Sequence, residues 1–259
     1  MLIDEDLQLL KTYPQPSLDA LAKYYESDDY ISHSNSKKTI FEKVYSFVRN
    51  FTIKKKLKLV EFCSPEKGLV LDIGAGTGDF LAAAKANHWK TYGIEPNEKA
   101  KGISKGKGLC IAEDTAGFDD NFFDIITMWH VLEHVPNLEE KIAELKRIIK
   151  PTGTILIAVP NFKSFDAKYY GKYWAAYDVP RHLWHFSKNA VHELFSKQQL
   201  KVVDIKPMLF DSFYVSLLSE KYKNKKVNIF KAFYIGLRSN LYGRKNKEFS
   251  SHIYLIKNK

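Results

Sequence analysis

A short apolar segment that runs into a glycine-rich turn is the feature that most constrains this chain. Residues 70–79 read Val-Leu-Asp-Ile-Gly-Ala-Gly-Thr-Gly-Asp. Glycine adopts backbone conformations that other residues avoid, and it lets a ligand approach the main chain closely. The next apolar run, 91–94, is followed by Glu95, whose carboxylate can accept hydrogen bonds from both hydroxyls of a ribose. The pattern therefore predicts a nucleoside-containing cofactor at a strand–turn–helix unit.

The charges around the turn distinguish between two classes of cofactor. A nicotinamide dinucleotide site typically reads Gly-x-Gly-x-x-Gly and receives a pyrophosphate at the helix N-terminus. Here the third glycine comes one residue early, Asp79 stands where that pattern has glycine, and Asp72 ends the predicted strand. Two carboxylates would repel a pyrophosphate but attract a cation. We therefore predict S-adenosylmethionine, which carries an ammonium and a sulfonium, and S-adenosylhomocysteine as its product.

Short apolar segments alternate with helical patterns along the chain, an order typical of a parallel sheet with crossover helices. We predict strands near residues 69–73, 90–94, 108–112, 123–128, 154–159, 201–206 and 253–256. Helices are predicted near 79–87, 97–105, 138–149 and 187–199. Ser187 is expected to cap the last of these helices.

Three stretches fall outside this alternation. Residues 1–60 are expected to form an N-terminal helical cap, followed by the main domain over 61–259. The aromatic-rich loop 160–186 leaves the carboxyl end of a predicted strand, where an open parallel sheet binds its ligand. Residues 210–250 form an insertion, predicted to be helical, before the last strand. Long excursions from a compact α/β domain usually act as lids or substrate walls, so we expect the last two to form the acceptor pocket.

Five segments carry a family resemblance: residues 71–78 (Leu-Asp-Ile-Gly-Ala-Gly-Thr-Gly), 93–95 (Gly-Ile-Glu), 123–126 (Phe-Asp-Ile-Ile), 131–135 (Val-Leu-Glu-His-Val) and 149–153 (Ile-Lys-Pro-Thr-Gly). Together they resemble the class I S-adenosylmethionine-dependent methyltransferases, in particular the branch with the ubiquinone-biosynthesis O-methyltransferases. The resemblance covers residues 66–160 best. It implies an α/β fold with a doubly wound, mostly parallel seven-stranded sheet, like a Rossmann fold, whose last strand is reversed.

The resemblance also implies roles for individual residues. Asp72 and the turn backbone would hold the methionine part, Glu95 the ribose, and Glu113 or Asp114 the adenine. The expected cofactor contacts are Asp72, Gly74, Ala75, Gly76, Gly78, Glu95, Pro96, Glu113, Asp114, Trp129 and His130. Candidates from the N-terminal region to close over the methionine carboxylate are Tyr25, Tyr30 and His33.

The segment His130-x-x-Glu133-His134 has two interpretations. His-x-x-Glu-His on a helix is also the signature of an inverted zinc peptidase. Here it follows a predicted strand of a cofactor-binding sheet, and no later helix offers an obvious acidic third ligand. Some quinone-pathway methyltransferases hold a divalent metal on a similar acid-x-x-Glu-His segment, but this chain has histidine in the first position. We therefore expect no metal, with Glu133 and His134 ordering the loop.

A second cluster, residues 177–187, lies in the predicted lid. A neutral histidine can take the proton of an attacking hydroxyl or amine. The candidates for that role are His182 and His185 in this cluster and His130 from the segment above. Trp174, Tyr177 and Arg181 are expected to contact the acceptor, and Arg181 would suit an anionic one. In the structural alternative, Arg181 pairs with Asp178 and the histidines pack among aromatic residues.

The composition of the chain indicates the cellular compartment and the kinds of partner to expect. The sequence has 259 residues, a formal net charge of +10 and two cysteines, Cys63 and Cys110, the second in a predicted buried strand. We expect a reduced, cytoplasmic protein with no transmembrane segment and no nucleic-acid partner, and the sequence leaves the oligomeric state open. The predicted reaction is methyl transfer to an oxygen, or else a nitrogen or carbon, of a small-molecule, sugar-like or lipid-like acceptor. A nicotinamide-dependent oxidoreductase and a non-catalytic cofactor-binding module are the alternatives.

Overall fold

The computed structural model describes residues 1–17, 20, 21, 24 and 40–259. Its internal contacts group these residues into two compact units. The first unit combines Met1–Pro16, Trp129–Ala143 and Leu156–Lys259, and the second combines Ser17–Met128 and Glu144–Ile155. This grouping does not follow the boundary between residues 60 and 61 that the sequence pattern suggests.

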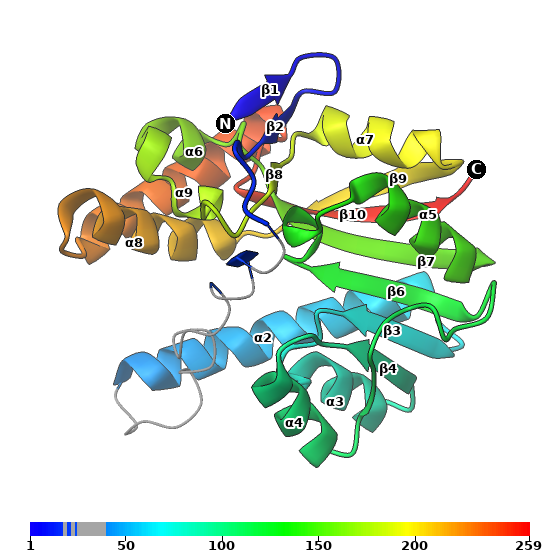
Figure 1. The fold of residues 1–259 in the computed structure, drawn as a ribbon. Coiled ribbons are helices and arrows are strands. Elements are labelled where there is room, and N and C mark those ends of the chain that lie inside the picture. Colours follow the sequence, from blue (N-terminus) through cyan, green and yellow to red (C-terminus); the bar gives the residue numbers. More distant parts are fainter. Residues whose placement is uncertain (18–19, 22–23, 25–39) are drawn as a thin grey trace. The chain divides into compact units, whose positions relative to one another are not determined.

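Seven strands form the main sheet, in the order β5-β4-β3-β6-β7-β10-β9 (Figure 1). Their bounds are β3 Leu69–Ile73, β4 Lys90–Ile94, β5 Cys110–Ala112, β6 Phe123–Trp129, β7 Ile149–Pro160, β9 Leu200–Pro207 and β10 Ser251–Asn258. Strand β3 pairs in parallel with β4 and β6, β4 pairs in parallel with β5, and β10 is antiparallel to β9. The expected doubly wound, mostly parallel seven-stranded sheet is thus confirmed.

The second unit is built around β3. Val70 and Leu71 are fully buried there, as expected for a strand covered on both faces. Its helices are α2 Ile40–Cys63, α3 Asp79–Ala86 and α4 Glu98–Gly106. Asn97 begins α4 by accepting a hydrogen bond from the Ala100 amide at 3.0 Å, an N-cap that satisfies one of the helix's free amides.

The first unit contains most of the chain beyond β6. Its helices include α6 Phe165–Tyr170, α7 Lys188–Lys197, α8 Asp211–Asn224 and α9 Ile229–Asn246. As predicted, Ser187 caps α7, accepting from the Ala190 amide at 3.1 Å. Helix α5, Leu138–Ile148, spans the two units in sequence and buries its predicted face, with Leu138, Ile142, Leu145 and Ile148 at most 4% exposed.

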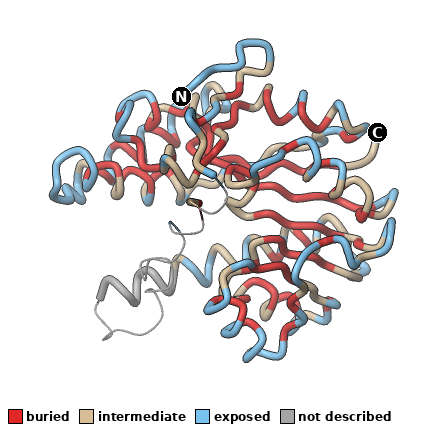
Figure 2. The backbone as a smooth tube through the Cα atoms, viewed as in Figure 1, coloured by how far each residue is buried: buried red, intermediate tan, exposed pale blue. Residues whose placement is uncertain are grey.

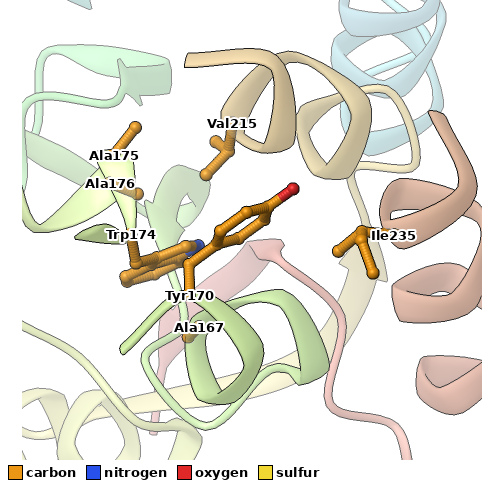
Figure 3. Packing of buried hydrophobic residues seen from close by; sticks show 7 residues of the cluster. All are labelled: Ala167, Tyr170, Trp174, Ala175, Ala176, Val215 and Ile235. Atoms are coloured by element: carbon orange, nitrogen blue, oxygen red, sulfur yellow. The ribbon is translucent and has the colours of Figure 1, made fainter. Parts of the chain in front are cut away.

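A hydrophobic cluster inside the first unit joins α6, α8 and α9. Figure 3 shows its members: Ala167, Tyr170, Trp174, Ala175, Ala176, Val215 and Ile235. Beside it, Asp166 is buried and accepts hydrogen bonds from Trp174 Nε1 (2.7 Å), Ser239 Oγ (2.5 Å) and Ser250 Oγ (2.7 Å). Helices α8 and α9 are therefore part of the unit's core and do more than cover an exposed sheet.

Several expectations need correction. Within the expected helical cap of residues 1–60, Leu2–Asp4 and Leu9–Lys11 form strands β1 and β2, which build a small sheet with β8, Trp184–His185. The expected loop 160–186 contains α6, the 3-10 helices η3 Gly171–Tyr173 and η4 Ala175–Tyr177, and β8. Cys110 begins β5 at an exposed position, so it is not buried. Short segments like these are formed by pairing and packing with distant residues, which local patterns do not report.

Burial follows the sheet and the cluster closely. Figure 2 shows mostly buried residues along the strands β3, β6, β7 and β10 and exposed residues around the α8–α9 connection. Both cysteines are free thiols. Within the part of the chain that the structure describes, no helix combines the length and the apolar character needed to cross a membrane.

Candidate functional site

The glycine turn between β3 and α3 has the conformation that its sequence predicts. Gly74, Gly76 and Gly78 have φ angles of 76°, 54° and 77°, in the left-handed region where a side chain would be strained. At Gly78, a Cβ atom would also lie 2.4 Å from Leu109 Cδ1. At Gly76, by contrast, a Cβ atom would meet nothing within 4 Å. The backbone at Gly76 is therefore open to a ligand, while Gly78 serves packing.

Glu95 closes this turn from the end of β4. Its two carboxylate oxygens accept hydrogen bonds from the amides of Gly76 (2.7 Å) and Asn97 (2.8 Å). Burial raises the pKa of Glu95, and the two amide hydrogen bonds oppose that rise. Each oxygen keeps a second lone pair, so the carboxylate can still accept from ligand hydroxyls beside Gly76.

Asp72 lies two residues before the turn and is 2% exposed. Its Oδ1 accepts a hydrogen bond from Thr127 Oγ1 at 2.6 Å. Burial raises the pKa of Asp72 to about 7, although the Thr127 hydrogen bond and the charge of Lys56 lower it. A cationic ligand would lower the pKa of this partly ionised carboxyl, because a nearby opposite charge favours the ionised form. The ionised carboxylate would in turn attract the ligand.

Asp79, which the sequence suggests would attract a cationic cofactor, forms ion pairs within the chain instead. Its carboxylate pairs with Lys107 at 2.7 Å and with Arg49 at 3.3 Å. Although partial burial raises the pKa of Asp79, the Lys107 hydrogen bond and the charge of Arg49 outweigh it, so the pKa lies below its ordinary value. Because two cations of the chain already neutralise this carboxylate, the attraction for a cationic cofactor has to come from Asp72 and Glu95.

The residues expected beside the adenine are at the surface. Glu113 and Asp114 follow β5 and are exposed, as is Pro96 after β4. Glu113 pairs with Lys101 at 2.8 Å, and Asp114 accepts from the Ala116 amide at 2.9 Å. The Lys101 hydrogen bond holds the pKa of Glu113 below its usual value.

On the first unit, His130 is held between two carboxylates. It follows Trp129, the half-buried last residue of β6, and has a φ of 59°. Its Nε2 lies 2.9 Å from Asp211 Oδ2 and its Nδ1 lies 3.3 Å from Glu133 Oε1. Burial works against the charged form, but the two carboxylates raise the pKa of His130 to about 10. His130 is thus an imidazolium at neutral pH, which makes it an unsuitable proton acceptor.

Glu133, His134 and His182 form a second cluster in the same unit. One ligand atom from each lies within 4.8 Å of the others. Glu133 is fully buried, and its Oε2 has no hydrogen-bond partner. His134 Nδ1 faces the Arg181 carbonyl (3.1 Å) and His182 Nδ1 faces the Ala176 carbonyl (2.8 Å). Since carbonyls only accept, both Nδ1 atoms carry protons, and in the neutral rings both Nε2 atoms are acceptors.

The remaining predicted acceptor residues are mostly buried. Burial lowers the pKa of His182 to about 4 and that of His185 to about 3. His185 Nε2 lies 3.1 Å from Thr12 Oγ1, and Arg181 pairs with Asp178 at 2.8 Å, as in the structural alternative. Trp174 is 2% exposed inside the cluster of Figure 3, so it packs in the core and offers no surface to an acceptor; Tyr177 packs edge-on against it, with ring centroids 5.0 Å apart.

Three residues that tune these sites are not among those predicted from the sequence. Thr127 lies opposite Asp72 in the β3–β6 register, and a hydroxyl between the apolar residues Ile126 and Met128 was the available signal. Asp211 of α8 left no such signal, because it is far in sequence from His130. Lys56 of α2 left none either, because it is one of four lysines within residues 54–58. The N-terminal candidates Tyr25, Tyr30 and His33 lie outside the described residues.

The fold and the turn together define a class of protein. A parallel sheet with a reversed last strand, a glycine turn after β3 and an acid after β4 are the features by which the chain resembles the class I S-adenosylmethionine-dependent methyltransferases. Residues 46–205 match the methyltransferase domain family. The chain belongs to this family, and the resemblance inferred from the sequence is thereby confirmed.

Similar proteins differ in what they methylate. The chain is 35% identical, over 118 residues, to a ubiquinone biosynthesis O-methyltransferase of Thiobacillus denitrificans, a match that covers 41% of this chain and 50% of the relative. It is 32% identical, over 103 residues, to a ubiquinone/menaquinone biosynthesis C-methyltransferase of Burkholderia mallei, covering 35% and 42%. The chain thus spans about half the length, or less, of these curated relatives.

Solved structures support the fold. Magnesium protoporphyrin IX methyltransferase from Synechocystis is 13% identical with a TM-score of 0.61, and the match covers 94% of this chain and all of that one. An S-adenosylmethionine-dependent methyltransferase from Thermotoga maritima is 20% identical with a TM-score of 0.52, covering 83% and 96%. At these identities the likeness concerns the fold alone.

Proposed function

We propose that this protein transfers a methyl group from S-adenosylmethionine to an oxygen of a small, lipid-like acceptor. The observation that carries the proposal is the geometry of the β3–α3 turn. The Gly76 backbone there is open to a ligand, and its amide donates a hydrogen bond to the Glu95 carboxylate. The buried Asp72 lies four residues before Gly76 in the sequence. The family membership supports methyl transfer, and the two curated relatives, named for O- and C-methylation in ubiquinone biosynthesis, support the choice of acceptor.

The residues present fit the cofactor. When bound, S-adenosylmethionine supplies an electrophilic methyl group. Asp72 would face its ammonium, Glu95 its ribose hydroxyls and Glu113 or Asp114 its adenine. Asp72 is thus the acid that would lie beside a cationic part of the ligand, where opposite charges attract.

The first unit offers groups for the acceptor. Methyl transfer is a direct displacement, so positioning of the two reactants can supply much of the rate. Among the three predicted catalytic histidines, His182 and His185 have the protonation state that a base needs, because burial lowers the pKa of each and keeps it neutral. We assign the base role to His182, because His185 Nε2 already contacts Thr12 Oγ1. His130 would stay bound between the Asp211 and Glu133 carboxylates. Arg181, although it pairs with Asp178, has further N–H donors that would suit an anionic acceptor. His185 would order the loop.

An activity assay tests this proposal. The protein is incubated with S-adenosylmethionine and fractionated quinone-precursor and lipid extracts, and S-adenosylhomocysteine is measured. We expect product that depends on an extract fraction and is lost in Asp72→Ala. Cofactor binding by calorimetry with no turnover on any fraction would instead favour a non-catalytic binding module, and preferential binding of NADH would favour an oxidoreductase.

A second candidate function is methyl transfer assisted by a divalent metal ion. One observation favours it: Glu133 Oε2 has no hydrogen-bond partner and lies in a cluster with His134 and His182. One carboxylate and two imidazoles form a donor set used by several divalent metals. Such an ion would polarise an acceptor oxygen and lower its pKa. The sequence-based prediction is that no metal is needed, and the chelation experiment described in the Discussion separates the two.

A further inference from the structure

Helix α9 presents a second apolar face that its own unit does not bury. Ala232, Ile235, Gly236, Ser239, Asn240 and Gly243 form its buried face. On the other side, Phe230 is 90% exposed, Phe233 60%, Leu237 42% and Leu241 53%. Their spacing of three and four residues places them on one stripe of the helix. Ile229 and Tyr234, 64% and 55% exposed, border this stripe.

The segment around this stripe is strongly basic. Residues 211–247 contain nine lysines and arginines and two acids, a formal charge of +7 within a chain of +10. Both acids are engaged inside the unit: Asp211 pairs with His130 at 2.9 Å, and Glu220 is fully buried with Lys231 at 3.4 Å. The α8–α9 connection is exposed throughout and carries Lys225, Lys226 and Val227. Positive charge and exposed apolar side chains therefore occur together on this hairpin.

We propose that the α8–α9 hairpin docks the protein onto an anionic membrane surface. The apolar stripe Phe230, Phe233, Leu237 and Leu241 would enter the acyl boundary, while Lys221, Lys225 and Lys226 meet the lipid head groups. An amphipathic helix with aromatic residues on one side and lysines around it binds in the plane of a bilayer in this way. Each lysine close to an anionic surface adds attraction that salt screens.

Charge and chemistry argue against two other occupants. A second copy on the same face would bring together two segments that each carry +7, and like charges across an interface are unfavourable. Nucleic acid would satisfy the lysines, but its phosphate backbone would leave aliphatic side chains such as Leu237 and Leu241 without an apolar partner. An anionic bilayer satisfies both parts of the surface.

Vesicle co-sedimentation tests the proposal without any acceptor or cofactor, so its outcome is independent of the proposed methyl transfer. The full-length protein is mixed with vesicles of phosphatidylcholine alone, or of phosphatidylcholine and phosphatidylglycerol in equal parts. We expect binding to the anionic vesicles at least tenfold tighter than to the neutral ones, and a large loss in about 0.5 M NaCl, where the screening length falls to a few ångströms.

Two variants separate the apolar and the charged contributions. Phe230→Ser with Leu237→Ser should weaken binding to anionic vesicles at least tenfold, and Lys225→Glu with Lys226→Glu should weaken it and reduce its salt dependence. Phe62→Ser serves as the matched control, because Phe62 is 74% exposed on α2 and far from the hairpin in sequence; it should bind like the unchanged protein.

Circular dichroism and melting temperature confirm that each variant is folded. Equal binding of the unchanged protein to neutral and anionic vesicles would overturn the proposal, as would retention of binding in both folded hairpin variants. Light scattering provides one more check: a dimer that forms without vesicles and is abolished by the Phe230 and Leu237 changes would assign the face to a second copy of the chain.

Discussion

Thr127 Oγ1 donates a hydrogen bond of 2.6 Å to Asp72 Oδ1 across the paired strands β3 and β6. The carboxyl is buried, and burial raises its pKa to about 7 more strongly than Thr127 and Lys56 lower it. The proposed cofactor-binding acid is therefore close to half ionised at neutral pH in the empty protein. This property makes both ligand affinity and stability sensitive to pH.

Replacing Thr127 with valine should weaken cofactor binding without touching the cofactor. The change removes a hydrogen bond that favours the ionised carboxylate, so the pKa of Asp72 should rise further. We expect lower affinity for S-adenosylmethionine at neutral pH and partial recovery at about pH 9, where the carboxyl ionises again. Calorimetry across this range provides the measurement; a pH-independent loss of affinity would point to a packing defect instead.

Replacing Asp72 with asparagine should stabilise the empty protein at alkaline pH. The pKa is about 7 in the folded state and 3.8 as its ordinary value, so the folded state binds the additional proton between these values. The contribution of this group to the free energy of unfolding is highest below pH 3.8 and is lost as the pH rises through about 7. Asparagine does not ionise, so the variant avoids that loss at alkaline pH. Each kcal/mol of unfolding free energy regained would raise the melting temperature by about 2–4 °C.

The same substitution should weaken cofactor binding. Loss of a hydrogen bond or ion pair to a charged group typically costs about 1.5–3 kcal/mol, and we expect a change in this range for Asp72→Asn and Asp72→Ala. The pair of measurements is informative, since a stabilised variant with weakened binding marks a functional residue. Wild-type affinity in both variants would remove Asp72 from the site.

Glu95→Ala should disturb the turn as well as the ligand. Two amides, of Gly76 and Asn97, donate to this carboxylate, and both would lose their acceptor. We expect cofactor affinity to fall by about 1.5–3 kcal/mol and the melting temperature to fall with it. Glu95→Gln is the matched control: its single carbonyl oxygen can keep one amide satisfied, so its stability should lie between the other two proteins.

Asp211→Asn should shift the ionisation of His130. The pKa of His130 is about 10, against an ordinary value of 6.5, so its contribution to stability is complete below pH 6.5 and is lost as pH rises through about 10. Without the Asp211 carboxylate the folded-state pKa of His130 should be lower, so the loss should be smaller and should end at a lower pH. Melting temperatures between about pH 6 and pH 10 measure this, and identical profiles for the two proteins would contradict the ion pair.

Chelation tests the prediction that no metal is needed. His130 already supplies positive charge to Glu133, whose pKa lies below its ordinary value despite full burial because of His130 and the neighbouring histidines. We expect a chelator to leave turnover and melting temperature unchanged. A metal on Glu133, His134 and His182 would instead be established by two results together. The chelator would abolish turnover until zinc or magnesium is added, and the added metal would not restore turnover in Glu133→Gln.

Much of the fold follows from local patterns in the sequence. The periodic burial of Leu138, Ile142 and Leu145 and the cap at Ser187 depend on residues within a few positions of each other, so the amino-acid pattern alone predicts them. The short strands at Leu2–Asp4 and Trp184–His185 could not be predicted in this way, because their small sheet is held together by pairing across more than 170 residues. The burial of Trp174 likewise depends on α8 and α9.

The sequence by itself determined the class of protein and the place of its cofactor turn, because the glycines, Asp72 and Glu95 are read directly from the chain. Only the tertiary structure decided the state of those groups. It placed Thr127 against Asp72, Lys107 and Arg49 against Asp79, and Asp211 against His130. The ionisation of a side chain depends on its burial and on nearby charges in space, and distance along the chain carries little information about either.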